Sequence, residues 1–333
     1  YDDLDIPADH FNLAWIVGSS ITIWDAPAQF RFHGRKEYEL SEVFAAQVKE
    51  INEKPLWIHQ YMIPAMRSGD IRFAVLEAAN DPEMDAYLME INPAWLFNNW
   101  LVYSDSNQRG SVVAMKQATT GDFIDAIKFA HASDILAAYS SRAFAFVRDR
   151  YVLKDALPSV KGLPFPLLEK PKPTRKLRYL DLNKFYPDRT FIAPEATKAH
   201  ESYRGVLLKQ TLSENAQAAR FFRRNLETLA KTGKPVLLYC PPLPPEMNDD
   251  PEVVAFMNDY GKLAQEMNER YGGNNVVIVT DSALDTRQPF KHRDIIHVRY
   301  GQGPIDEIKS MLVEDLGLSL TPFSEPDDYR SAP

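Results

Sequence analysis

A serine, an aspartate and a histidine occur at positions that could support acyl transfer. Ser20 follows an apolar run, residues 13–17, and a turn at Gly18, where a hydroxyl can lie beside backbone N–H groups at a strand end. Asp294 and His297 stand three residues apart before a bend with two glycines. An imidazole can accept the serine proton, and a carboxylate can orient the imidazole and stabilise its charged form. The order Ser, Asp, His permits a Ser-His-Asp triad.

Each of these residues also has a purely structural interpretation. A serine after a strand is more often a helix cap or a turn residue. Asp294 with His297, taken alone, is more often part of a solvated loop. The triad hypothesis therefore depends on the pairing of Ser20 with that motif at a neighbouring strand end.

Alternating strand-like and helix-like segments predict the parallel β-α-β units that would position these residues. We expect an α/β fold: a flavodoxin-like five-stranded parallel sheet with helices on both faces, within one domain over residues 1–333. Strands are predicted at 13–17, 55–61, 86–91, 235–240 and 276–280, and helices at 39–51, 71–79, 214–231, 252–271 and 304–316. Ligands bind such sheets beyond the carboxyl ends of the strands. The site is therefore expected in the exit loops 18–24, 62–70, 92–100, 240–250 and 281–303.

Two segments interrupt this alternation. Residues 95–157 have an almost wholly helical pattern and are interpreted as a helical insertion. Residues 158–194 carry many prolines and the basic stretch KPKPTRKLR, which favours an extended connector. That stretch could contact anionic headgroups or an anionic polymer, but a solvated linker is the default interpretation.

Composition excludes several classes of function. The chain has 333 residues with 24 Pro, 14 Gly and a single Cys, so disulfide frameworks and cysteine-based zinc sites are excluded. There is no dinucleotide-binding glycine fingerprint and no histidine spacing typical of a metal site, so no cofactor or metal is expected. A net charge of −8 argues against nucleic-acid binding. No apolar run approaches the roughly 20 residues of a membrane helix. The start at Tyr1 leaves open a removed signal peptide or an N-terminal helical anchor.

The candidate residues resemble motifs of the SGNH/GDSL hydrolase superfamily. The resemblance is carried by Gly18-Ser19-Ser20 after the first strand, Asn92 after the third, and Asp294 with His297 before the last helix. It implies that Ser20 is the nucleophile, that Asp294 and His297 complete the triad, and that Asn92 helps to form the oxyanion hole. Gly69 is the only candidate for the second oxyanion position, although it could instead begin a helix.

Within that superfamily the chain is most similar to DltD-like extracytoplasmic acyltransferase proteins. The shared features are GSS in place of GDS, the Pro-x-Trp turn in INPAWLF and the helical insertion that follows. The chain departs from the usual Ser-Pro-Gln-Trp-Phe turn, because it has Asn-Pro-Ala-Trp-Leu at residues 92–96. The resemblance implies O-acyl transfer to a cell-envelope polymer or glycan, a membrane-bound O-acyltransferase partner, and a periplasmic or cell-surface location.

Aromatic residues are concentrated near the predicted site. All five Trp occur in the first 100 residues. Trp24 and Trp95 are candidates for the wall of an acyl or sugar pocket, whereas Trp15 and Trp57 are expected in the core. Cys240 is interpreted as an inert buried thiol and His59 as a core histidine. Two alternatives stay open: a free carbohydrate or lipid esterase of the same superfamily, and a non-catalytic polymer-binding or scaffold module.

Overall fold

A computed structural model describes parts of the chain, namely residues 8–16, 22–25, 37–61, 68–90, 119–122, 124, 217–239, 251–273, 275–278, 291–292, 298–300 and 303–323. The chain divides into two compact units. The first comprises Tyr1–Ser104 with Thr190–Pro333, and the second comprises Asp105–Arg189. Among the described residues, no helix combines the length and apolar character needed to cross a membrane.

A short helical start is the described part of the second unit. The Thr119 backbone N–H donates to Asp122 Oδ2 (2.8 Å), and the Asp122 N–H donates to Thr119 Oγ1 (3.3 Å). This reciprocal pair is a capping box, which satisfies backbone donors at the start of a helix. The rest of the predicted insertion and the whole connector 158–194 lie outside the described residues.

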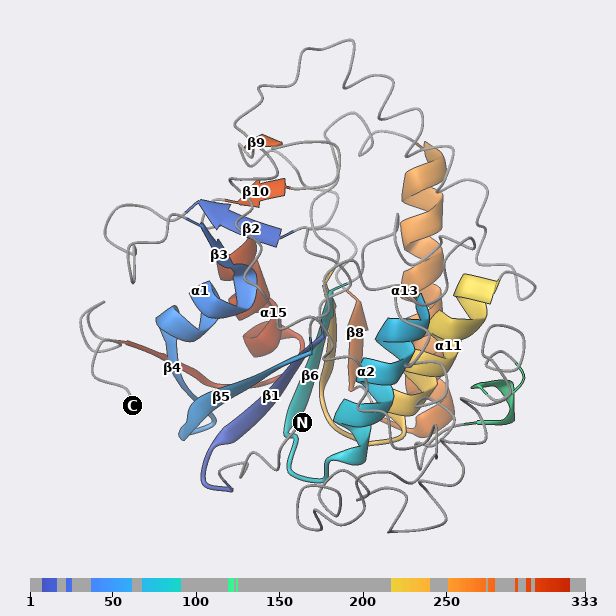
Figure 1. Ribbon diagram of the computed structural model, residues 1–333, viewed down its shortest axis with the longest axis horizontal. Helices are drawn as coiled ribbons and strands as arrows, with labels where there is room; N and C mark the ends of the chain where they lie inside the picture. Colours follow the sequence, from blue (N-terminus) through green and yellow to red (C-terminus); the bar gives the residue numbers. More distant parts are fainter. Residues whose placement is uncertain are drawn as a thin grey trace, which may run out of the picture. The chain divides into compact units, whose positions relative to one another are not determined.

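A seven-stranded, mostly parallel sheet forms the centre of the first unit, so the protein has a mixed α/β fold (Figure 1). Five strands run parallel to their neighbours, in the order β5-β1-β6-β7-β8: β1 (Phe11–Ile16), β5 (Lys54–Tyr61), β6 (Ala86–Glu90), β7 (Val236–Tyr239) and β8 (Val276–Ile278). Two antiparallel strands extend the sheet beyond β5: β4 (Val48–Ile51) and β11 (Leu320–Pro322). The expected sheet of five parallel strands therefore needs correction, because the sheet is larger and mixed.

Strand β1 shows why the chain forms a sheet that is covered on both faces. All six of its residues, FNLAWI, are buried. Successive side chains of a strand point to opposite faces, and an almost wholly apolar strand is typical of a parallel sheet with helices on each side. Accordingly, Ala14 and Ile16 belong to one core cluster, and Leu13 and Trp15 belong to the other.

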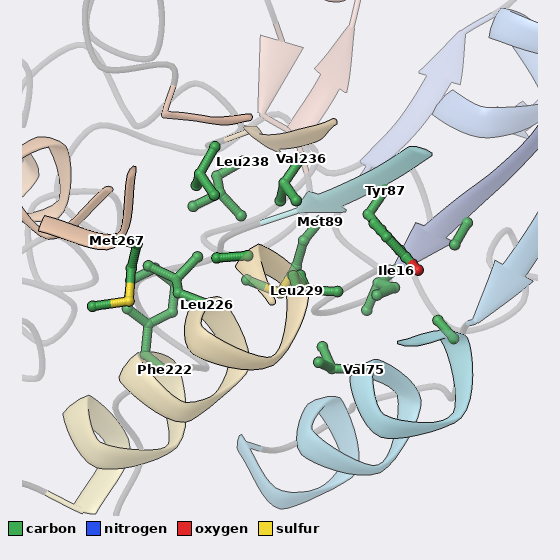
Figure 2. Close-up of a cluster of buried hydrophobic side chains, with 14 of the residues drawn as sticks. Ile16, Val75, Tyr87, Met89, Phe222, Leu226, Leu229, Val236, Leu238 and Met267 are labelled. Carbon is green, nitrogen blue, oxygen red and sulfur yellow. The ribbon is translucent and has the colours of Figure 1, made fainter. Parts of the chain in front are cut away.

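Three helices supply the first core cluster: α2 (Ser68–Asn80), α11 (Gln217–Ala230) and α13 (Pro251–Tyr271). Figure 2 shows Met89 from β6 close to Leu229 from α11, and Val75 from α2 below Ile16. Arg72 of α2 is also buried, and its Nη1 donates to Thr228 Oγ1 (2.8 Å) on α11. Apolar packing and this polar contact together join α2 to α11.

Two helices supply the second core cluster: α1 (Leu40–Gln47) and α15 (Gly303–Glu314). Phe44 of α1 packs against Trp15 with a ring separation of 5.5 Å. Ile305 and Ile308 of α15 are buried in the same cluster as Leu237 of β7. The helices thus lie on both sides of β1 and β6 (Figure 1).

A second sheet of four short strands was not predicted from the sequence. Its order is β3-β2-β10-β9, with β3 (Glu37–Glu39), β2 (Thr22–Asp25), β10 (Val298–Tyr300) and β9 (Lys291–His292). Strand β10 pairs parallel with β2, and the other two pairings are antiparallel. Parts of the segments interpreted as the exit loops 18–24 and 281–303 are therefore strands.

The predicted helix over residues 39–51 was too long. Helix α1 ends at Gln47, and Val48–Ile51 forms strand β4 instead. β-Branched Val48 and Ile51 are buried, and the following turn has positive φ at Asn52 (51°) and Glu53 (65°). Such a turn is typical of a tight hairpin, and here it joins β4 to β5.

Candidate functional site

The small sheet joins chain segments that come from opposite ends of the sequence. Thr22 is the register partner of Val298, and Trp24 is the partner of Tyr300. Val298 is in turn paired with His292 of β9. Three segments, 22–25, 291–292 and 298–300, are therefore held side by side by backbone pairing.

In the sequence, these three segments lie next to the three residues of the predicted triad. Ser20 precedes Thr22 by two residues, Asp294 follows His292 by two residues, and His297 immediately precedes Val298. Ser20, Asp294 and His297 themselves lie outside the described residues. The same holds for Asn92, Trp95 and Cys240.

Two further candidate residues fall in described elements. Gly69 is the second residue of α2, which begins at Ser68, in agreement with its alternative interpretation as a residue at a helix start. Trp24 lies in β2 between register partners Tyr38 of β3 and Tyr300 of β10. The backbone of Trp24 therefore belongs to the small sheet that flanks the predicted triad.

A buried carboxylate that was not predicted from the sequence lies at the carboxyl end of β6, between the neighbouring parallel strands β1 and β7. Glu90 is the last residue of β6 and only 3% exposed. The indole Nε1–H of Trp15 in β1 donates to Glu90 Oε1 at 2.7 Å. Tyr239, the last residue of β7, is the register partner of Glu90 and is also buried. The sequence signal that could have identified Glu90 was an acidic residue at the end of the otherwise apolar segment AYLME.

The two tryptophans expected in the core behave differently. Trp15 is fully buried, which confirms that expectation, but Trp57 is 43% exposed, so that prediction was wrong. Strand β5 has only short pairing with β4, and all of its residues are exposed or half-buried. The Trp57 ring instead packs edge-on against His10, with ring centroids 5.7 Å apart.

His59 is half-buried in β5 beside Trp57. Its Nε2 lies 3.3 Å from Asn12 Oδ1, and burial lowers the pKa of its imidazole, with Asp81 acting in the opposite direction. This arrangement agrees with a packed histidine that has a polar partner. In the described part of the chain, no group of three or more His, Cys, Asp or Glu side chains is placed to hold a metal ion.

Comparison of the chain with protein-family models and with curated proteins finds no match.

Proposed function

We propose that the chain is a serine-dependent acyl-transfer protein of the SGNH type, with Ser20 as nucleophile, His297 as general base and Asp294 as the group that orients His297. The observation that carries the proposal is the pairing of β2, β10 and β9 in one small sheet. A residue spans at most about 3.6 Å of extended chain. Since each candidate lies only one or two positions from a residue of a paired strand, the pairing supports a common site for all three.

The strand order of the large sheet supports the finer fold assignment. Numbered along the chain, the five parallel strands have the order 2-1-3-4-5, which is the order of flavodoxin-like sheets. In such sheets ligands bind outside the carboxyl ends of the strands. The segments that contain Ser20 and Asn92 follow the carboxyl ends of β1 and β6 directly.

The proposed reaction has two steps. Ser20 Oγ attacks the carbonyl carbon of an ester or thioester while His297 takes the hydroxyl proton, and the leaving group departs with that proton. Backbone N–H groups near Ser20, the N–H of Gly69 and the Asn92 side chain stabilise the oxyanion. A hydroxyl of the acceptor then attacks the acyl-serine ester and gives its proton to His297, which passes a proton to the Ser20 oxygen as the acyl-serine bond breaks. No cofactor takes part.

The resemblance suggests the biological setting of this reaction. The acceptor is a hydroxyl of a cell-envelope polymer or glycan, and Trp24 and Trp95 contribute walls of the substrate site. A membrane-bound O-acyltransferase supplies the acyl group, and the protein works outside the cytoplasm. These statements depend on the likeness to DltD-like proteins.

A serine-reactive fluorophosphonate probe tests the catalytic proposal. We expect wild-type protein to be labelled on Ser20, as located by peptide mass spectrometry, and Ser20→Ala to be unlabelled. Ser19→Ala is the matched control, because it removes the neighbouring hydroxyl and leaves Ser20 in place. Absence of labelling in the wild type would leave the binding or scaffold module as the better account, as would labelling that persists in Ser20→Ala.

Hydrolysis of a short-chain chromogenic ester separates the two enzymatic alternatives. A transferase should release product faster when a sugar or polyol acceptor is added, because the acceptor removes the acyl group from Ser20. A free esterase should show no dependence on the acceptor. Loss of both activities in Ser20→Ala is expected in either case.

A further inference from the structure

Glu90 is a buried acid in β6, and every other residue of that strand is apolar or a tyrosine. Ala86, Tyr87, Leu88 and Met89 are buried with it. Transfer of a carboxylate out of water costs several kcal/mol unless hydrogen bonds compensate. An acid at this position therefore needs a reason beyond packing.

The Trp15–Glu90 hydrogen bond links the ends of two neighbouring strands. Trp15 is the penultimate residue of β1, and Glu90 is the last residue of β6. In the register Trp15 faces Leu88, so the 2.7 Å bond to Glu90 runs diagonally toward the carboxyl edge of the sheet. Phe44 of α1 packs on the Trp15 ring and holds the indole from the helix side. The Trp15 indole is thus held by packing against Phe44, and the Glu90 carboxylate is held by its place at the end of β6.

We propose that Glu90 is a positioning residue that acts through Trp15 to fix the exits of β1 and β6 relative to each other. Ser20 follows the end of β1 by four residues, and Asn92 follows Glu90 by two residues. Backbone pairing already holds β1 beside β6, and the hydrogen bond adds a side-chain link next to the segments that carry the nucleophile and the oxyanion donor. The inference rests on the proposed function. A displacement of about 1 Å in a catalytic group can lower a rate by about 10²-fold.

Three variants separate positioning from simple stability. Trp15→Phe removes the N–H donor and keeps an aromatic ring. Glu90→Met removes the acceptor at similar volume, and Glu90→Gln keeps an oxygen acceptor. Glu90→Met leaves the buried Trp15 N–H without its Glu90 acceptor, which costs about 1–3 kcal/mol. A purely structural role thus predicts that Glu90→Met loses thermal stability while the folded variant keeps its rate.

Tyr87→Phe is the matched control. Tyr87 lies three residues before Glu90 on the opposite face of β6, in the other core cluster. Its hydroxyl is buried and lies close to Thr232 rather than to Glu90. Removal of that hydroxyl should therefore leave the labelling rate unchanged.

The rate of fluorophosphonate labelling at Ser20, with kcat and KM for a chromogenic ester, tests the inference. We expect Trp15→Phe and Glu90→Met to lower the labelling rate and kcat about tenfold or more, with KM little changed. Glu90→Gln should recover most of the rate, and the Trp15→Phe/Glu90→Met double variant should be no slower than either single variant. Thermal unfolding of each variant confirms that the compared proteins are folded.

The outcomes distinguish the two proposals. Wild-type protein that is not labelled on Ser20 overturns both. Labelling that depends on Ser20 but proceeds at the wild-type rate in Trp15→Phe and Glu90→Met overturns the positioning role alone. Additive losses in the double variant, or a loss in Glu90→Gln equal to that in Glu90→Met, also overturn it.

Discussion

Thr22 of β2 and Val298 of β10 are direct register partners in parallel strands, although they lie near opposite ends of the chain. This pairing brings the segment that follows β1 beside the segment that precedes α15. It is the structural basis of the proposed catalytic site, because the candidate nucleophile and base flank these two strands.

An engineered disulfide tests that pairing. Cysteines at Thr22 and Val298, in a Cys240→Ser background, should form a cross-link under mild oxidation. Adjacent strands are about 4.8 Å apart, within reach of the Cα separations that disulfides accept. Mass spectrometry of a proteolytic digest would detect the linked peptides.

The control for the disulfide is the pair Thr22→Cys with Arg299→Cys in the same background. Successive residues of a strand point to opposite faces, so this pair should cross-link much more slowly. Equal rates for the two pairs, or no cross-link in either, would contradict the register.

Arg72 joins helices α2 and α11 through several bonds. Besides Thr228, its Nη1 donates to the Arg224 carbonyl oxygen at 3.0 Å and to Asn225 Oδ1 at 3.3 Å. Arg72→Ala should lower the free energy of unfolding by about 3 kcal/mol, because it leaves buried acceptors without their donor and opens a cavity. Urea unfolding measures the change.

Arg223 of α11 offers a comparison at the contact of that helix with α13. Its bridge to Glu266, at 3.3 Å, lies at the surface between α11 and α13. Arg223→Ala should cost less than about 1 kcal/mol, since exposed ion pairs contribute little. A similar loss in both arginine variants would argue against the special role of Arg72.

The β4–β5 turn can be made more stable. Glu53 is exposed and has a φ of 65°, a left-handed conformation that glycine adopts without a steric penalty. Glu53→Gly should raise the free energy of unfolding by about 0.5–1 kcal/mol, as measured by chemical denaturation.

Asn52 in the same turn should respond differently. Its φ is also positive, but its Oδ1 accepts a hydrogen bond from the Ser319 N–H at 2.9 Å, which ties the turn to the segment before β11. Asn52→Gly gives up that bond, so we expect no gain in stability. A gain as large as that of Glu53→Gly would show that the side-chain contact contributes nothing.

Glu77 of α2 makes stability depend on pH. Burial raises the pKa of its carboxyl above the ordinary value of 4.5, so the folded state holds the proton more tightly than the unfolded state. The stability contributed by the protonated form is complete below pH 4.5 and is lost as pH rises through the folded-state pKa. Glu77→Gln should therefore be more stable than the wild type at pH 7, with a difference that shrinks as the pH falls.

Urea unfolding of both proteins at several pH values measures this difference. Glu83→Gln provides a comparison at an exposed position in the loop before β6. It should alter stability little, because its side chain is exposed. A Glu77→Gln difference that is the same at pH 4 and pH 7 would contradict the linkage.

The candidate site was only partly accessible to prediction from the sequence. The motif around Ser20 and the pair Asp294 and His297 can be recognised because their residue types and order suggest one chemistry. Glu90 was missed because an acid at a strand end has no distinctive pattern until its partner is known. That partner, Trp15, lies far away in the sequence and meets Glu90 only through the pairing of β1 with β6.

The amino-acid sequence by itself determined the elements whose signals are local. Apolar runs and helical periodicity predicted β1, β6, β7, α2, α13 and α15 close to their observed bounds, and Gly233, at φ 71°, follows the end of α11 as predicted. These signals are local because burial of one face, or capping of one end, depends on neighbouring residues. Only the tertiary structure decided the rest. Short strands such as β2, β4 and β10 are stabilised by partners distant in sequence, and the exposure of Trp57 follows from its position in the sheet.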